Sequence, residues 1–432
     1  MAREMPFLEQ FRIEEAREGL IHFVFDMPDR SMNVFSNAAI QELGRFSAWL
    51  KQTDVRGVVV RSGKASAFCA GADLGELGAA YDMIVAAPEA ERFQLAFDHF
   101  FPLSQAIRAL ETSGKPIAAA IGGLALGGGC ELALGTHHRV LVDTPKAALG
   151  LPESLVGLLP GGGGTQRLPR LIEIDRALPI LIAGARLSGR SALEAGLVDQ
   201  LVPDGEEVAA AEQWLLSTTE AIQPWDRPEW TSAAPAAAST RVAKARRQVL
   251  SETLGHQPAP LAILDCIEQG LPLPFDDAIR TEMRLFSMLI QRREPRNMIR
   301  TLFVGKLDYE RDVKAGSLAA TVEHAIAALS QASREAVIRG GASLAAAGFV
   351  AAGGERPGPV QEVVGQGYWI DGGDDDPRRA LAREALMPLV GLAKQLAAEL
   401  SDAEKRRVDF AIVSQAGFPA YLGGPIAFAE TR

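Results

Sequence analysis

The sequence has few cysteines and no long apolar run. Among its 432 residues there are three cysteines, Cys69, Cys130 and Cys266, which are far apart and form no paired motif. This spacing fits neither a disulfide framework nor a zinc site, and it favours a reducing compartment. No stretch approaches the ~20 apolar residues of a membrane span, and the first residues carry acids where a signal peptide needs an apolar run. We therefore expect a cytoplasmic protein without a membrane span.

Positive charge is also in short supply. The 44 Lys and Arg residues against 54 Asp and Glu residues give a formal net charge of −10. Because affinity for nucleic acid comes largely from clustered Lys and Arg, this balance argues against a nucleic-acid binder. An anionic small ligand stays possible, since it needs only local positive charge or backbone N–H groups. Hydrophobic residues make up 47% of the chain, enough to bury a sizeable core.

Two common catalytic motifs are missing. The glycine run Gly161–Gly164 is not followed by the Lys-Ser/Thr ending of a P-loop, which argues against hydrolysis of nucleoside triphosphates. No G-x-S-x-G elbow occurs, which argues against a serine thioesterase.

The first half of the chain alternates strand and helix patterns. Gly19–Phe25 and Val55–Val60 are short β-rich runs, and Asn37–Leu50 between them has apolar residues at helical spacing. Lys115–Ile121 predicts another strand, which runs into the glycine-rich segment Gly122–Gly129. This order indicates an α/β fold with glycine loops at strand ends.

The second half has a different pattern. Ala221–Ser239 is rich in Pro, Ala and Ser and predicts a linker or covering loop. From Thr240 onward the sequence is almost wholly helical in pattern, with helices expected near 241–254, 276–292, 317–350 and 377–400.

Gly122–Glu131 is the first segment that could carry chemistry. Three glycines, Gly127–Gly129, lead into residues typical of a first helical turn, and Glu131 lies in that turn. Glycines let the backbone approach a ligand, and a helix N-terminus presents unpaired N–H groups. For this segment alone, a tight turn with Glu131 at the positive end of the helix dipole is an equally good interpretation.

Two more segments carry an acid beside a turn. In Leu149–Thr165, Pro152 precedes Glu153 and a glycine run follows, a pattern that by itself usually means a solvated carboxylate. In Ala67–Leu74, an apolar stretch ends at Asp73, which could cap a following helix and leave amides exposed at the turn.

Together, the three segments supply what conjugate addition to an acyl thioester requires. Two backbone N–H donors should face the thioester oxygen, which gains charge as water attacks the β-carbon. A base must take a proton from water while an acid delivers one to the α-carbon. Two neighbouring carboxyl groups can divide these roles, because burial and mutual repulsion separate their pKa values.

The segments AFCAGADLGEL, KPIAAAIGGLALGGGCELALG and LGLPESLVGLLPGGGGTQRLPR resemble the signature stretches of the crotonase (enoyl-CoA hydratase/isomerase) superfamily. The resemblance runs from about residue 8 to residue 215. It implies an α/β fold built as a spiral of ββα units and a substrate bound as a CoA thioester, without a cofactor or a metal. It also implies that Glu131 and Glu153 are the catalytic pair and that the amides of Ala72 and Gly128 form the oxyanion hole.

The presence of both glutamates favours a hydratase, because relatives that only shift a double bond often keep just the second. The resemblance thus implies syn addition of water to trans-2-enoyl-CoA, giving 3-hydroxyacyl-CoA. A Δ3,Δ2-enoyl-CoA isomerase, or other chemistry through a thioester enolate, is an alternative. Another is a structural subunit that docks to a β-oxidation enzyme. A homo-oligomer is also possible.

The second half resembles parts of the multifunctional α subunits of fatty-acid β-oxidation. Pro258–Ile267 and Arg296–Asp312 are similar to their helical linker, and Val408–Ala429 is similar to the end of their 3-hydroxyacyl-CoA dehydrogenase part. No strand leads into a G-x-G-x-x-G turn after Asp312, so we expect no NAD-binding domain and no dehydrogenase activity. We expect a crotonase-like catalytic core over residues 1–220 and a helical linker or covering region over residues 221–312. A helical domain that resembles the C-terminal part of the dehydrogenase should follow over residues 313–432.

A basic cluster precedes the loop that contains Ala70. It consists of Lys51, Arg56, Arg61 and Lys64, which are the basic residues nearest to that loop in the sequence. We expect Lys64 and the loop at Ala70 to contact CoA, although ordinary solvated side chains would give the same pattern. Four phenylalanines fall on one predicted helix, where they could pack in the core or line the acyl pocket: Phe93, Phe97, Phe100 and Phe101.

Overall fold

The computed structural model describes residues 5–65, 67–228, 230, 235–349, 368–373 and 376–432. The chain folds into two compact units. The first consists of Met1–Leu155, Leu159–Ala243 and Ala262–Gln291, and the second of Val156–Leu158, Lys244–Leu261 and Arg292–Arg432.

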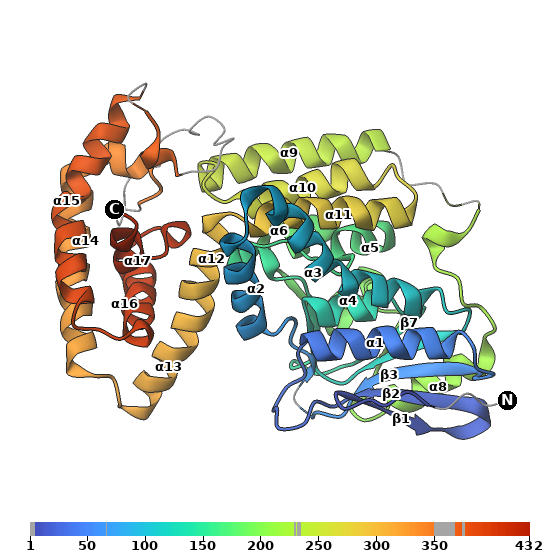
Figure 1. Cartoon of the computed structure of the whole chain (residues 1–432). Coiled ribbons are helices and arrows are strands. Elements are labelled where there is room, and N and C mark those ends of the chain that lie inside the picture. Colours follow the sequence, from blue (N-terminus) through green and yellow to red (C-terminus); the bar gives the residue numbers. More distant parts are fainter. Residues whose placement is uncertain (1–4, 66, 229, 231–234, 350–367, 374–375) are drawn as a thin grey trace. The chain divides into compact units, whose positions relative to one another are not determined.

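In its described residues, the first unit contains ten strands. It also contains most of the helices up to α11 (Figure 1). Its strands are β1 Phe11–Glu15, β2 Leu20–Phe25, β3 Gly57–Ser62, β4 Ala67–Cys69, β5 Ile117–Ile121, β6 Leu124–Leu126, β7 His138–Val142, β8 Ala148–Gly150, β9 Arg186–Ser188 and β10 Gln200–Val202. Its helices are α1 Asn37–Leu50, α2 Leu74–Ala86, α3 Glu89–Glu111, α4 Gly128–Leu134, α5 Gly164–Leu171, α6 Ile174–Ala183, α7 Gly189–Glu194, α8 Glu207–Ser217 and α11 Phe275–Ile290. The 3-10 turn η2 Glu153–Val156 begins in this unit, and its last residue belongs to the second. Helices α9 Pro235–Thr253 and α10 Pro258–Gly270 each have residues in both units.

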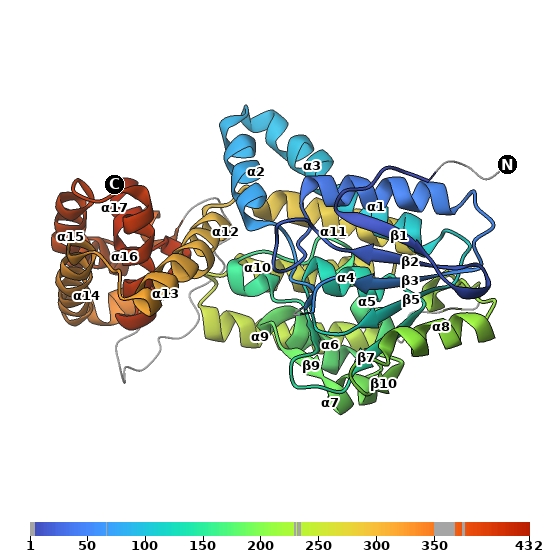
Figure 2. The ribbon, with the colours of Figure 1, turned by 90° about the horizontal axis from the view of Figure 1, so that it is seen from below.

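Six strands form the larger sheet, in the order β1-β2-β3-β5-β7-β10, parallel except for β1. Helices α1 and α8 cover its two faces (Figure 2). Phe23 of β2 stacks on Phe46 of α1. Leu20 of β2 lies three residues before Phe23, so its side chain is on the opposite face of the sheet. Leu20 pairs with Gly57 of β3, and a Cβ at Gly57 would lie 3.1 Å from Leu215 of α8. Burial on both faces explains why β3 is apolar without alternation.

Four short strands form a second sheet, in the order β4-β6-β8-β9, in which β4, β6 and β8 are parallel. The chain enters the two sheets alternately. The strand pairs β3–β4 and β5–β6 each place the first strand in the larger sheet and the second strand in the smaller one, and each is followed by a helix, α2 or α4. The pair β7–β8 repeats the pattern and leads into η2. This repetition is a spiral of ββα units, as the sequence predicted.

The boundaries of the units differ from the predicted ones at residues 220 and 312. The segment 262–291, predicted as part of the helical linker or covering region 221–312, belongs to the first unit. Helix α11 packs against α3 and α5 through a face that includes Phe275, Ile279, Met283 and Phe286, all of them buried. An apolar face of that width is stable only when it is covered, so α11 packs onto the unit that also contains the glycine loops. Of the predicted linker Ala221–Ser239, residues 229 and 231–234 lie outside the described part of the chain.

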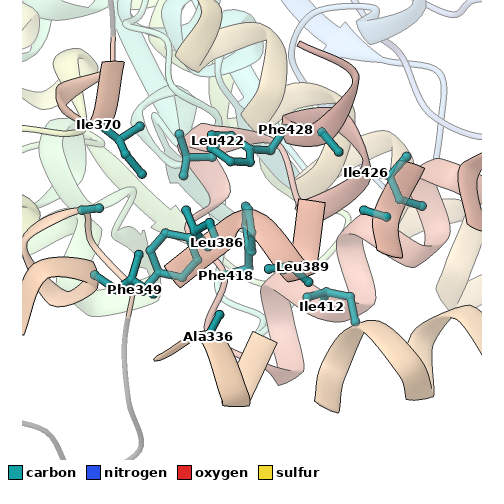
Figure 3. Packing of buried hydrophobic residues seen from close by; sticks show 14 of the residues in the cluster. Ala336, Phe349, Ile370, Leu386, Leu389, Ile412, Phe418, Leu422, Ile426 and Phe428 are labelled. Atoms are coloured by element: carbon teal, nitrogen blue, oxygen red, sulfur yellow. The ribbon is translucent and has the colours of Figure 1, made fainter. Parts of the chain in front are cut away.

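The second unit is helical in its described residues. Its main helices are α12 Arg293–Met298, the π-helix η4 Ile299–Gly305, α13 Lys306–Ala315, α14 Ala320–Ala346, α15 Pro377–Ala397, α16 Asp402–Gln415 and α17 Pro425–Glu430. Figure 3 shows its apolar core, where Leu386 and Leu389 of α15 lie close to Phe418 and to Ile412 of α16. The predicted helices near 317–350 and 377–400 correspond to α14 and α15.

No helix among the described residues is long and apolar enough to cross a membrane.

Candidate active site

Three neighbouring strands of the smaller sheet end at the same edge. Strand β4 pairs with β6, and β6 with β8, in parallel, with Cys69 opposite Ala125 and Leu126 opposite Gly150. The carboxyl ends of parallel strands meet at one edge, which is the usual place for a site in an α/β protein. The segments that follow these strands contain the three predicted elements of the site: the loop 70–73, the start of α4, and Glu153.

Gly127 is the point where these segments converge. Its φ of 52° and ψ of −128° are accessible essentially to glycine alone. A Cβ at this residue would lie 2.7 Å from Oε1 of Glu153 and 3.4 Å from Cα of Gly71. The glycine therefore lets the Glu153 carboxyl group and the 70–73 loop both approach the first turn of α4.

Glu131 is held in the first turn of α4 by two backbone amides. Its Oε1 accepts hydrogen bonds from the N–H groups of Gly162 and Gly164, at 2.7 and 2.8 Å. Burial raises the pKa of Glu131 to about 7, and the two amides partly offset that rise. A Cβ at Gly162 would lie 2.6 Å from the other oxygen, Oε2, so the loop can approach only because it is glycine. With such a pKa, Glu131 can both hold and release a proton near neutral pH.

Glu153 is the second acid, at the start of η2. Its Oε2 is shielded from solvent and has no hydrogen-bond partner among the residues that the structure describes. Burial and the negative charge of Glu131 raise the pKa of Glu153 well above its ordinary value. A shielded carboxyl oxygen without a partner is uncommon in a folded protein and often marks a functional site. When Glu131 is ionised, Glu153 therefore keeps its proton.

The predicted oxyanion amides lie on segments that touch. The Gly127 turn contacts Gly71, which places Ala72 and Gly128 on adjoining stretches of backbone. The loop around Ala72 is fixed on both sides, because Phe35 N–H donates to the Gly71 carbonyl and Asp73 N–H to the Phe35 carbonyl. Within the described chain, neither Ala72 N–H nor Gly128 N–H has a hydrogen-bond acceptor. The two amides are thus free to bind a substrate oxygen.

Asp73 caps α2, as the sequence predicted. Its carboxylate accepts hydrogen bonds from the N–H groups of Gly75 and Glu76. Asn33, which the sequence did not single out, holds the other end of the loop: its carbonyl accepts from Ala70 N–H, and its side chain donates to the carbonyls of Phe25 and Phe68. The Ala70 amide is therefore engaged within the protein.

Lys64, predicted to contact CoA, is held by its own neighbours. Its ammonium pairs with Asp26 at 2.8 Å and donates to the Met27 carbonyl at 2.6 Å. Its side chain is 18% exposed, so a phosphate could reach it only at one side and in competition with Asp26.

Two buried groups behind the glycine loop were not found from the sequence. Arg167 of α5 donates to the Gly162 carbonyl and pairs with Glu111 of α3 at 2.9 Å, and both side chains are fully buried. Glu282 of α11 accepts from the N–H groups of Gly163 and Thr165. The signal for Glu282 was an acid on the apolar face of an amphipathic helix, three residues after Ile279 and four before Phe286.

The four phenylalanines of the 93–101 region all lie on α3. Phe97 and Phe101 are neighbours at 5.0 Å between ring centroids, and Phe100 lies 4.9 Å from Phe286 of α11. Phe101 is buried, and Phe93 is partly exposed. Two other apolar side chains lie closer to the site. A Cβ added to Gly128 would lie within 3.6 Å of both Phe35 and Leu103. Phe35 and Leu103 therefore lie beside the predicted oxyanion residue Gly128.

The described residues contain no group of three or more His, Cys, Asp or Glu placed to hold a metal ion. In comparisons with known proteins, residues 15–257 of the chain match the family described as enoyl-CoA hydratase/isomerase. The chain is a member of that family. Its crotonase-like α/β fold, predicted from the sequence, is confirmed.

The chain also resembles fatty acid oxidation complex subunits alpha. The protein of that name from Shewanella amazonensis is 33% identical over 310 residues, which are 71% of this chain and 42% of that protein. The one from Shewanella loihica is 34% identical over 318 residues, 72% of this chain and 43% of that protein. The chain thus spans less than half the length of these relatives. The predicted resemblance to the multifunctional α subunits is confirmed.

Two solved structures illustrate the structural likeness. DspI of Pseudomonas aeruginosa is 28% identical, with 50% of this chain and 83% of that chain covered and a TM-score of 0.42. An enoyl-CoA hydratase from Bacillus anthracis is 24% identical, with 71% and 96% covered and a TM-score of 0.43. Both TM-scores are low, and neither structure bears on the function of this chain.

Proposed function

We propose that this protein hydrates trans-2-enoyl-CoA to 3-hydroxyacyl-CoA by syn addition. The observation that carries the proposal is the pair of shielded acids, Glu131 and Glu153, beside two unpaired amides at one sheet edge. Family membership supports the class of chemistry, since hydratases and isomerases of this family share a thioester enolate. CoA enters as part of the substrate, and the reaction needs neither a cofactor nor a metal.

The two acids take different roles because their proton affinities differ. Glu131, with a pKa of about 7, is the group that ionises first and serves as the base. It takes a proton from water as the water oxygen bonds to the β-carbon. Glu153, with its pKa raised further, keeps its proton and delivers it to the α-carbon. Afterwards Glu131 carries the proton and Glu153 is ionised, so one proton exchange with solvent or between the two acids restores the starting state.

Backbone amides handle the charge that develops in between. As the β-carbon is attacked, electrons move into the thioester carbonyl, and its oxygen becomes an oxyanion. The N–H groups of Ala72 and Gly128 bind that oxygen, and they need no reorganisation because their loops are already fixed by backbone hydrogen bonds.

The test is loss of enoyl-thioester absorbance with short, medium and long substrates. Glu131→Gln and Glu153→Gln should each lower kcat roughly 100- to 10,000-fold, the range for loss of a general acid or base. Glu42→Gln is the matched control, because Glu42 is also buried and accepts backbone N–H groups, but lies on α1 away from the site. Hydration that survives in both site variants at the rate of the control would reject the proposal.

A second candidate is a Δ3,Δ2-enoyl-CoA isomerase. It is favoured by one observation: Glu153 has an unpaired oxygen, while Glu131 is tied to two amides, so a single mobile carboxyl group could move the proton between carbons. The Glu131→Gln variant separates the two functions. In a hydratase, water addition falls steeply in this variant. In an isomerase, 3-enoyl-CoA is still converted to the 2-enoyl product.

Association with itself or with another β-oxidation enzyme is a further proposal, supported by the names of the relatives as subunits of a complex. Light scattering after size-exclusion chromatography would give the mass of the purified chain in solution, and co-elution with a thiolase would identify a complex.

A further inference from the structure

Glu282 is a buried acid that takes no part in the proposed proton transfers. It lies on α11, has 0% exposure, and sits among the apolar side chains Ile279, Met283 and Phe286. A carboxyl group in such a place destabilises the fold unless directional bonds compensate for its lost hydration. No cationic side chain in the described part of the chain forms an ion pair with it. An apolar side chain would suit this face of α11 better, so the bonds made by Glu282 need another explanation.

All of these bonds go to the glycine loop behind Glu131. Gly163 N–H donates to Oε1 of Glu282 at 2.7 Å, and Thr165 donates to Oε2 through its N–H at 2.9 Å and its hydroxyl at 2.5 Å. The intervening amides, Gly162 and Gly164, donate to Glu131. Four consecutive N–H groups thus alternate between two acids from two helices. This alternation depends on Gly163, whose φ is 96°.

We propose that Glu282 is a positioning residue. It fixes the peptide groups of Gly163 and Thr165, and thereby holds the amides of Gly162 and Gly164 against the carboxylate of Glu131. This role rests on the proposed hydration, in which Glu131 is the base. Without Glu282 the loop could rotate these amides away, and Glu131 would lose both its orientation and the donors that stabilise its charged form.

Other charged groups face the same loop and contribute to any effect of pH. Burial, and after it the negative charge of Glu131, raises the pKa of Glu282 to about 8. Arg167 faces the loop as well, but it is paired with Glu111 of α3. The remaining groups that sense the charge of Glu282 are Glu153 of η2, Arg170 of α5 and Cys266 of α10.

A positional role and a purely electrostatic role of Glu282 predict different shifts of the pH–rate profile, so an experiment can tell them apart. Glu282→Leu removes both acceptors at similar volume. If Glu282 acts through position, Glu131 loses its amide donors, its pKa rises, and the acid limb of the kcat/KM profile moves to higher pH. If Glu282 acts only through its charge, removing that charge moves the same limb to lower pH, and only as far as Glu282, whose pKa is about 8, is ionised where Glu131 titrates.

The expected kinetic effect is graded. Glu282→Gln keeps one acceptor and should lower kcat roughly 10-fold, and Glu282→Leu roughly 100-fold, as for a small misplacement of a catalytic group. KM should change by less than about 3-fold, because Glu282 bonds to Gly163 and Thr165 and not to the proposed oxyanion amides of Ala72 and Gly128. If Glu282→Leu fails to fold, Thr165→Val can replace it, because it removes only the hydroxyl that donates to Glu282. Thr165→Ser is its control, because serine keeps a hydroxyl at this position. We expect a loss of several-fold in the former and near-normal kcat in the latter.

The measurements are pH profiles of hydration of crotonyl-CoA and calorimetric binding of butyryl-CoA, which cannot react, for each folded variant. The proposal is supported if the acid limb of the profile moves to higher pH while the affinity for butyryl-CoA is retained. A limb that is unchanged or displaced downward, or an unchanged kcat in Glu282→Leu and Thr165→Val, overturns it while hydration by the wild type stands. A wild type that hydrates no enoyl thioester overturns the proposed function, and the role of Glu282 with it.

Discussion

The two acids of the site differ in what surrounds their oxygens. Glu131 has two amide donors on one oxygen, and Glu153 has a shielded oxygen without a partner in the described structure. The donors lower the proton affinity of Glu131 relative to Glu153, so in the proposed mechanism backbone geometry rather than residue type decides which glutamate is the base and which is the acid.

The raised pKa of Glu131 predicts that stability falls as pH rises. Its pKa is about 7 when folded, against an ordinary value of 4.5. The folded state therefore binds this proton more tightly than the unfolded chain does. The resulting stability is fully present below pH 4.5 and is lost as pH rises through 7, a change of about 3 kcal/mol. Glu131→Gln cannot ionise and should show a smaller fall.

Chemical denaturation at about pH 5 and about pH 8, on either side of that titration, measures this difference by tryptophan fluorescence. Four of the five tryptophans, Trp49, Trp214, Trp225 and Trp230, belong to the first unit, so the signal reports mainly on the unit that holds the site. The prediction is contradicted if the free energy of unfolding falls by the same amount between the two pH values in the wild type and in Glu131→Gln.

Replacing Gly127 by alanine should lower activity by more than backbone strain alone would explain. In Gly127→Ala the new methyl group would lie 2.7 Å from Oε1 of Glu153, so we expect hydration to fall more than ~100-fold, as for a displaced catalytic group. Gly205→Ala is the control, because Gly205 also has a positive φ, of 84°, but nothing lies within 4 Å of its Cβ position. Both variants should lose roughly 1 kcal/mol or more of stability from strain. Equal activities of the two variants would show that Gly127 serves only the turn.

Helices α3 and α5 are joined behind the site by a buried ion pair, Arg167 with Glu111. Glu111→Ala would leave the Arg167 guanidinium buried without its carboxylate and should destabilise the first unit by roughly 3–5 kcal/mol. The exposed pair Arg227–Glu220, with side chains 41% and 67% exposed, is the comparison, and Glu220→Ala should change stability by less than ~1 kcal/mol. Thermal unfolding of both variants measures the contrast, and similar melting temperatures would refute it.

Elements with a strong local pattern were predictable from the sequence. Helix α1 has the predicted bounds Asn37–Leu50, β2 and β3 fall within two residues of the predicted runs, and Asp73 caps α2 as expected. These features depend on neighbours a few residues apart. The candidate residues Glu131 and Glu153 were singled out from their glycine-rich segments, and the family resemblance implied their catalytic roles. The shared sheet edge explains why the segments that carry them converge.

Features that depend on distant segments were not predictable in this way. Glu282 bonds to a residue 119 positions earlier in the chain, and no periodicity links the two. The same reason explains why α11 was assigned to a separate covering region. An amphipathic helix indicates that one face is buried, but not which partner buries it.

At the scale of the whole molecule, the chain corresponds to less than half of the multifunctional relatives that it resembles. No strand leads into a dinucleotide-binding glycine turn after Asp312 in the sequence. We therefore predict that the protein forms no NADH from NAD and a 3-hydroxyacyl-CoA, measured by NADH absorbance on the scale of its hydration rate. The Shewanella relatives, assayed in parallel, would be the comparison. NADH formation by this chain would refute the prediction.

The edge formed by β4, β6 and β8 has a consequence for how such a site can change. Neighbouring strands are held about 4.8 Å apart by their ladder of hydrogen bonds, whatever side chains they carry. In the proposed site, the spacing between the segments that carry the two amides and those that carry the two acids is therefore set by the peptide backbone. Substitutions in the strands should weaken the scaffold before they alter its dimensions, whereas the segments beyond the strand ends can vary and so admit thioesters of other shapes.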